Sequence, residues 1–103
     1  MEIIKSKNCI PIRLPDERWL HITEEHSEMA GYYFEVLETL EEPEIIYEGN
    51  AGELFAKKEV EKDKYIVVIY KESNEKDGFI ITAYLTRRKL QLVRRKKQWQ
   101  RQK

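Results

Sequence analysis

The sequence predicts an α+β domain with amino-terminal helices packed on an antiparallel β-meander of about four strands and a basic C-terminal helix. In the first half, apolar residues recur every three or four positions, as on one face of a helix. In the second half, apolar runs alternate with short turn-prone segments. The length of 103 residues suits one folded unit. We therefore predict a single domain over residues 1–87 and a helical tail over residues 88–103.

The amino-terminal part predicts short strands followed by two helices. Alternation in "EIIK" and "CIPIRL" indicates one or two strands, and Pro11 restricts the second to a sheet edge or a bulge. Pro15 and the acidic residues after it favour the start of a helix, because these residue types suit its first turn. That helix is expected to end near Ile22. A second helix, ended by Pro43, is indicated by the spacing of Met29, Tyr33, Val36, Leu37 and Leu40.

After Pro43, "IIYEG" is followed by three more runs that predict strands: "ELFAKKEV", "YIVVIYKES" and "GFIITAYLTR". Their short connections favour antiparallel neighbours. The continuous apolar run "YIVVIY" is typical of a central strand covered on both sides. Alternation in the last run predicts that three hydroxyl groups share one sheet face. One face is expected to carry Thr82, Tyr84 and Thr86, and the other Phe79, Ile81, Ala83 and Leu85.

The formal net charge is zero, but the two signs are separated along the chain. All 19 acidic residues precede residue 87, and nine of the 19 basic residues follow residue 86. This basic segment, with Trp99, suits neutralisation of phosphates and stacking of an indole on a base. A second interpretation places Leu90 and Val93 on the apolar side of a helix that packs on the acidic body, with the cations solvated or paired to glutamates. Both interpretations stay open, and the tail also suits an acidic protein partner.

Several classes of protein are disfavoured. Cys9 is the only cysteine, so neither an intrachain disulfide nor a cysteine-based zinc cluster is expected. The short apolar stretches near the amino terminus are interrupted by lysines, and no apolar run has the length of a membrane span. We expect a cytoplasmic protein without a membrane partner.

The stretch "RWLHITEEHSEM" holds both histidines, His21 and His26. Imidazole titrates close to physiological pH, so two such groups near a substrate can share the roles of general base and general acid. Their spacing differs from the i, i+4 pair of a helical zinc motif, and no metal site is predicted. The plainer alternative is that His26 lies exposed before a helix and that His21 caps the short helix.

This stretch, the later "LEEPEII" and the terminal "GFIITAYLTRRK" together resemble the phage-associated branch of the BECR superfamily, the Barnase/EndoU/Colicin/RelE-like nucleases. In that branch a motif like W-x-H-I-x-x-x-H-P precedes a helix, and the last strand is similar to I-x-T-A-Y-x-T. The similarity covers roughly residues 10–90 and departs at Ser27, where the family often has proline. The matching positions are Trp19, His21, Ile22, His26, Pro43, Ile46, Ile80 or Ile81, Thr82, Ala83, Tyr84 and Thr86.

The resemblance implies metal-independent RNA cleavage without a cofactor, in a toxin-like or phage-derived protein whose partners are RNA and an antitoxin or another protein. It implies acid and base work by His21 and His26, and contacts to phosphate or ribose by Thr82, Tyr84 and Thr86. Beside the resemblance, Lys57, Arg87, Arg88 and Trp99 are candidates for substrate binding, as cations or as a stacking ring. The alternative function is a non-catalytic module that binds nucleic acid or protein through the basic tail.

Overall fold

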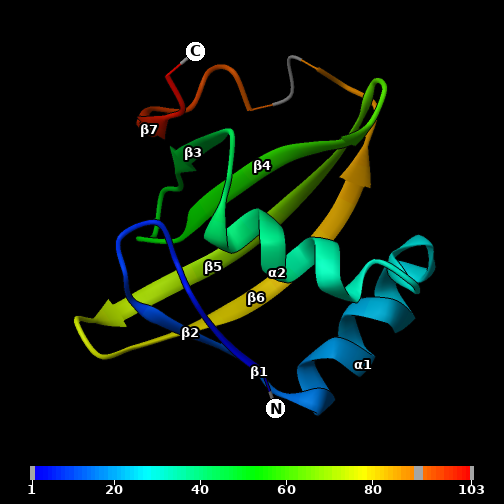
Figure 1. Ribbon diagram of the computed structural model, residues 1–103, viewed down its shortest axis with the longest axis horizontal. Helices are drawn as coiled ribbons and strands as arrows, with labels where there is room; N and C mark the ends of the chain where they lie inside the picture. Colours follow the sequence, from blue (N-terminus) through cyan, green and yellow to red (C-terminus); the bar gives the residue numbers. More distant parts are fainter. Residues whose placement is uncertain (1, 90–91, 103) are drawn as a thin grey trace.

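In the computed structural model, which describes residues 2–89 and 92–102, one sheet organises the chain (Figure 1). Within the described residues it has seven strands in the order β1-β2-β6-β5-β4-β3-β7. Neighbouring strands are antiparallel except β2 and β6, which are parallel. The strands are β1 (Glu2–Lys5), β2 (Pro11–Leu14), β3 (Ile45–Glu48), β4 (Leu54–Glu61), β5 (Lys64–Asn74), β6 (Asp77–Thr86) and β7 (Lys97–Gln100).

The helices lie between β2 and β3 in the sequence: α1 (Asp16–Glu25), the short 3-10 helix η1 (Ser27–Met29) and α2 (Tyr33–Glu41). α2 crosses one face of the sheet, and α1 lies at the side of β6 (Figure 1). None of the described helices combines the length and the apolar character that a membrane crossing needs.

The main core lies between α2 and the sheet. Val36 and Leu40 from α2 pack with Ile66, Val68 and the other apolar side chains on that face of the sheet. Burial of such aliphatic side chains contributes roughly 1.5–3 kcal/mol each relative to exposure. The buried members of this core are Ile12, Leu14, Ile22, Met29, Val36, Leu40, Ile46, Leu54, Ala56, Ile66, Val68, Tyr70, Ile80 and Ala83.

The opposite face of the sheet has a smaller apolar cluster, formed by Tyr47, Phe55 and Val67 with Tyr84 and Leu92 packed against it. Leu92 belongs to the segment that leads from β6 to β7. Residues 92–96, which we call the covering segment, therefore lie over this second face. α2 thus covers one face of the sheet, and the basic covering segment covers part of the other.

The predicted fold class is wrong. The chain is mostly sheet with two short α-helices, and the described part of residues 88–103 holds no helix. Leu92 has φ +73°, a conformation that cannot continue a right-handed helix. β7 then pairs with the outer edge of β3, which supplies hydrogen-bond partners for that strand. Leu90, expected on the apolar side of the helix, lies outside the described residues.

A bulge in β6 changes which side chains reach the main core. Ile69 pairs with Thr82 and Tyr70 with Ile80, so Ile81 is an extra residue in β6. Consequently Ile80, rather than Phe79 or Ile81, joins Ala83 in the main core. After the bulge, alternation resumes with a half-buried Thr82 on the face opposite α2. Tyr84 and Thr86 follow on that same face.

Candidate functional site

The site is built at the free edge of β6. β2 pairs with β6 only at Gly78 and Phe79, so the rest of this edge faces α1 and η1. The Arg18 guanidinium of α1 donates to the Ile81 carbonyl at 3.4 Å. This contact places the first turn of α1 beside the edge of β6.

His26 lies at the junction of α1 and η1. Its backbone N–H donates to the Ile22 carbonyl at 2.8 Å and ends α1. Its imidazole ring lies 6.1 Å from the Tyr84 ring between centroids, with the planes tilted by 37°. A histidine from the helical part and a tyrosine from the last long strand therefore meet beside the second face of the sheet.

The His26 imidazole also faces a carboxylate. Its Nδ1 lies 3.7 Å from Oε2 of Glu28, and both side chains are partly exposed. With Nδ1 turned toward Glu28, Nε2 is the nitrogen left to meet a substrate. A carboxylate in this position orients the ring, as in many imidazole and carboxylate pairs.

Tyr84 is half-buried, and burial raises the pKa of its phenol because the phenolate loses hydration. The positive charge of Arg95 acts in the opposite direction on this pKa. Tyr84 therefore keeps its proton at neutral pH and can donate it in a hydrogen bond.

Arg95 belongs to the covering segment and is held over the sheet. Its guanidinium carbon lies 4.5 Å from the centroid of the Phe55 ring, a cation–π contact. Its backbone N–H donates to the Leu92 carbonyl at 2.9 Å. A positive charge is thus fixed over Phe55, on the sheet face that carries the hydroxyl groups.

The two predicted histidines are not equivalent in the structure. His21 is exposed on α1, and among the described residues no ring contact or hydrogen bond joins it to His26 or Tyr84. Sequence spacing alone does not reveal this difference. The structure brings His26, and not His21, to the Thr/Tyr face.

The two predicted threonines share the face of Tyr84, and within residues 2–89 and 92–102 only the Thr86 hydroxyl has a hydrogen bond. The Thr86 hydroxyl accepts a hydrogen bond from the Arg88 N–H at 3.1 Å and ends the strand. Thr82 lies opposite Ile69 and is half-buried. Both hydroxyls are on the side of the sheet on which Tyr84 lies.

Arg87 and Arg88 are exposed directly after β6. Arg87 borders a small pocket of about 260 Å³, with Thr86 and Glu28 among its walls. Because Glu28 also faces His26, this pocket adjoins the His26 and Tyr84 pair. Among the cations predicted to bind substrate, Arg87 is therefore the one that lines this pocket.

Lys57 lies on the same face but is buried, with 5% of its surface exposed. Its amine donates to the Lys89 carbonyl at 2.6 Å and lies 4.7 Å from the centroid of the Tyr65 ring. Burial lowers the pKa of this amine, although Glu44 acts in the opposite direction. These contacts make Lys57 an anchor for the chain that follows β6.

Trp99 is far from His26 in the sheet, because β7 and β6 are separated by three strands. It packs against the main core, and the Lys7 amine lies 4.6 Å from the centroid of its ring. The structure therefore does not bring Trp99 to the hydroxyl face.

Sequence reasoning missed Glu28, Phe55 and Arg95. Glu28 follows His26 by two positions, and this proximity is a signal for a carboxylate and imidazole pair. Arg95 is one cation in a basic run, and nothing local in the sequence separates it from its neighbours.

Among the described residues, no group of three or more histidine, cysteine, aspartate or glutamate side chains is placed to hold a metal ion. Comparisons with protein-family models, curated proteins and solved structures find no match to this chain.

Proposed function

We propose that this protein is a small endoribonuclease that cleaves RNA without a metal ion, with His26 and Tyr84 as its catalytic pair. The observation that supports this best is the approach of the two rings to 6.1 Å, on the sheet face where Arg95 lies over Phe55. A base, a hydroxyl donor and a cation are the three kinds of group that phosphodiester transfer to a neighbouring hydroxyl requires. RNA as the substrate class rests on the resemblance to the BECR nucleases, which the proposal retains.

In the proposed reaction, His26 removes the proton of a ribose 2′-hydroxyl as its oxygen forms a bond to the adjacent phosphorus. The bond from phosphorus to the 5′-oxygen breaks, and Tyr84 donates its proton to that departing oxygen. The products are a 2′,3′-cyclic phosphate and a 5′-hydroxyl. Water returns the proton of the imidazolium to the phenolate. Glu28 orients the imidazole during these steps, since its carboxylate faces Nδ1.

Positive charge beside the pair supports binding of the phosphodiester. Arg95 acts on Tyr84 from the covering segment, and Arg87 borders the adjoining pocket. Such fixed cations stabilise charge that develops on the non-bridging oxygens. The acidic body lowers the total charge, but local potential decides where a phosphate binds.

A second candidate function is nucleic-acid binding without catalysis. It is favoured by the exposure of Arg87, Arg88 and Lys89 after β6, a cluster that suits phosphate contacts. A protein partner such as an antitoxin is proposed on the same surface, because an acidic chain complements the same cations. These uses need the basic chain but not His26.

Cleavage of a fluorescent single-stranded RNA separates the two functions. His26→Ala should lower the cleavage rate by about 100-fold or more, the typical contribution of a general base. His21→Ala is the matched control and should leave the rate within about twofold, since the exposed His21 lacks contact with the pair. Chelator should leave the rate unchanged. Equal rates for wild type and His26→Ala would exclude the proposed catalytic role.

A further inference from the structure

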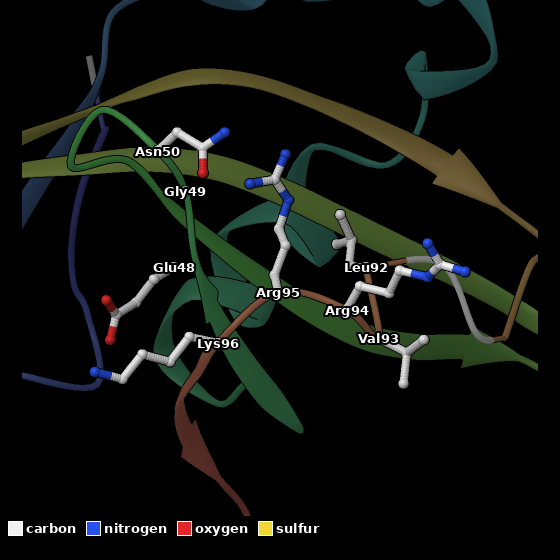
Figure 2. Close-up of a pocket in the computed structure, with 8 residues that line it drawn as sticks. All are labelled: Glu48, Gly49, Asn50, Leu92, Val93, Arg94, Arg95 and Lys96. Atoms are coloured by element: carbon white, nitrogen blue, oxygen red, sulfur yellow. The ribbon is translucent and has the colours of Figure 1, made fainter.

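A larger pocket is lined in part by the covering segment. It has a volume of about 610 Å³ and lies between the turn after β3 and the covering segment (Figure 2). That volume is in the range of about 300–1,000 Å³ typical of small-molecule sites. The residues that line it are Glu48, Gly49, Asn50, Leu92, Val93, Arg94, Arg95 and Lys96.

The side chains of this pocket favour an anion. Arg94, Arg95 and Lys96 supply three positive charges, and Glu48 supplies one negative charge. The Arg95 side chain extends toward Asn50, whose amide can add a hydrogen-bond donor to the guanidinium (Figure 2). A phosphate group matches this combination of planar cation and neutral donor.

The walls of the pocket are held in place before any ligand arrives. The Glu48 N–H donates to the Lys96 carbonyl at 2.8 Å, which joins the two segments. Leu92 has φ +73°, an unfavourable backbone conformation for this residue. The packing of its side chain into the cluster on the second sheet face holds that conformation. A preformed site loses less entropy on binding than a flexible one.

The pocket also has an apolar side. Val93 is 52% exposed and lines the pocket together with Leu92. An inorganic anion gains nothing from contact with an apolar wall, whereas the face of a nucleobase packs favourably against one. A nucleotide has both a phosphate and a base, so it matches both the cationic and the apolar side of the pocket.

We infer that this pocket is a nucleotide subsite, in which Arg95 and Asn50 hold a phosphate and Val93 contacts the base. Leu92 connects it to the catalytic pair, because this side chain lines the pocket and packs against the same apolar cluster as Tyr84. The inference deepens the proposed function and rests on it for the identity of the ligand as part of an RNA chain: the subsite holds a nucleotide neighbouring the one cleaved.

Calorimetric titration with adenosine 5′-monophosphate tests the subsite directly. Asn50→Asp keeps the size of the side chain but places a negative charge beside the phosphate, so it should weaken binding by about tenfold or more. Asn74→Asp is the matched control, because it adds the same charge at the last residue of β5, outside the pocket. Binding to this control should match wild type within about twofold.

Two further ligands and one further variant make the test decisive. Inorganic phosphate and adenosine should each bind at least about tenfold more weakly than the monophosphate; equal affinity for either would overturn the inference. Binding should persist in His26→Ala, which lies outside the pocket. If cleavage depends on His26 but the monophosphate does not bind, or binds Asn50→Asp equally well, only the subsite is wrong. If it binds as described but His26→Ala cleaves normally, only the catalytic proposal is wrong.

Discussion

The imidazole of His26 lies against the phenol of Tyr84, with ring centroids 6.1 Å apart. The contact depends on the short pairing between β2 and β6, which leaves the far end of β6 open to η1. If β2 paired along the whole of β6, that edge would be closed to His26. The pair is therefore a product of sheet topology as much as of the two residues.

Tyr84→Phe removes only the hydroxyl of the proposed acid. We expect the single-turnover cleavage rate to fall by about 100-fold while RNA affinity stays within about twofold, because the proton donor acts only in the transition state. Because burial raises the pKa of Tyr84, the wild-type rate should not decline through loss of this proton below about pH 10. A decline well below that pH, after correction for uncatalysed hydrolysis, would argue against Tyr84 as the donor.

Lys57→Gln should loosen the covering segment. The variant loses a charged hydrogen bond to the Lys89 carbonyl, so the free energy of unfolding should fall by roughly 1–3 kcal/mol. Hydrogen exchange in residues 92–96 should become faster. Lys58→Gln is the control, since Lys58 pairs at 3.2 Å with an exposed Glu38 and should cost less than about 1 kcal/mol.

The lowered pKa of Lys57 also predicts a pH dependence of stability. Between the lowered pKa in the folded protein and the ordinary lysine pKa of 10.5, the unfolded state binds more protons than the folded state. The wild-type free energy of unfolding should therefore receive a contribution from Lys57 that rises with pH in this window. Denaturant titrations should show that Lys57→Gln lacks this contribution, and an identical slope in both proteins would contradict the assignment.

Tyr70→Phe should stabilise the protein by about 1 kcal/mol. Tyr70 is fully buried, and its hydroxyl has no hydrogen-bond partner among the described residues, so the phenol loses hydration without replacement. Burial also raises its pKa, so wild type should lose stability above pH 10 as the unfolded phenol ionises, and the variant should lose less. Urea titration measures both effects, with Tyr47→Phe as a control on the other sheet face. A less stable Tyr70→Phe would mean that the hydroxyl is hydrogen-bonded in the folded protein.

Asp77→Asn should change how the stability of the fold depends on pH in the acidic range. Arg13 donates to both carboxylate oxygens of Asp77, at 2.7 and 3.0 Å, and this hydrogen bonding lowers the pKa of Asp77. The pair therefore stabilises the fold above the ordinary carboxyl pKa, and this contribution is lost as pH falls through the lowered folded value. Thermal unfolding from about pH 2 to pH 7 should show a smaller dependence in the variant. Asp63→Asn, in the exposed turn after β4, should keep the wild-type dependence.

Local sequence patterns predicted segments better than they predicted their arrangement. The runs "YIVVIY" and "GFIITAYLT" do lie in β5 and β6, because continuous apolar residues and β-branched residues favour strands. The alternation of apolar and polar residues gives no sign of the bulge at Ile81. The prediction that Phe79 and Ile81 share a sheet face with Ala83 is therefore wrong. Pro11 is not on an edge strand: it is the first residue of β2, where a missing N–H is tolerated.

The basic tail was predicted to be a helix, but the structure has the strand β7 there. Leu90, Val93 and Trp99 suggested a helical side, but a strand on the edge of β3 satisfies more backbone groups than a short isolated helix. For the site, sequence placed the three hydroxyl residues on one strand, whereas the choice between His21 and His26 needed the position of α1 beside β6. Long-range contacts decided both outcomes.

The most direct test of the account is a double-mutant cycle on single-turnover RNA cleavage with wild type, His26→Ala, Tyr84→Phe and the double variant. Groups that act in one chemical step are not additive, so the double variant should be no slower than His26→Ala alone, with RNA affinity unchanged in all four proteins. Rates that are equal in all four proteins would contradict the claim that these two side chains perform the chemistry.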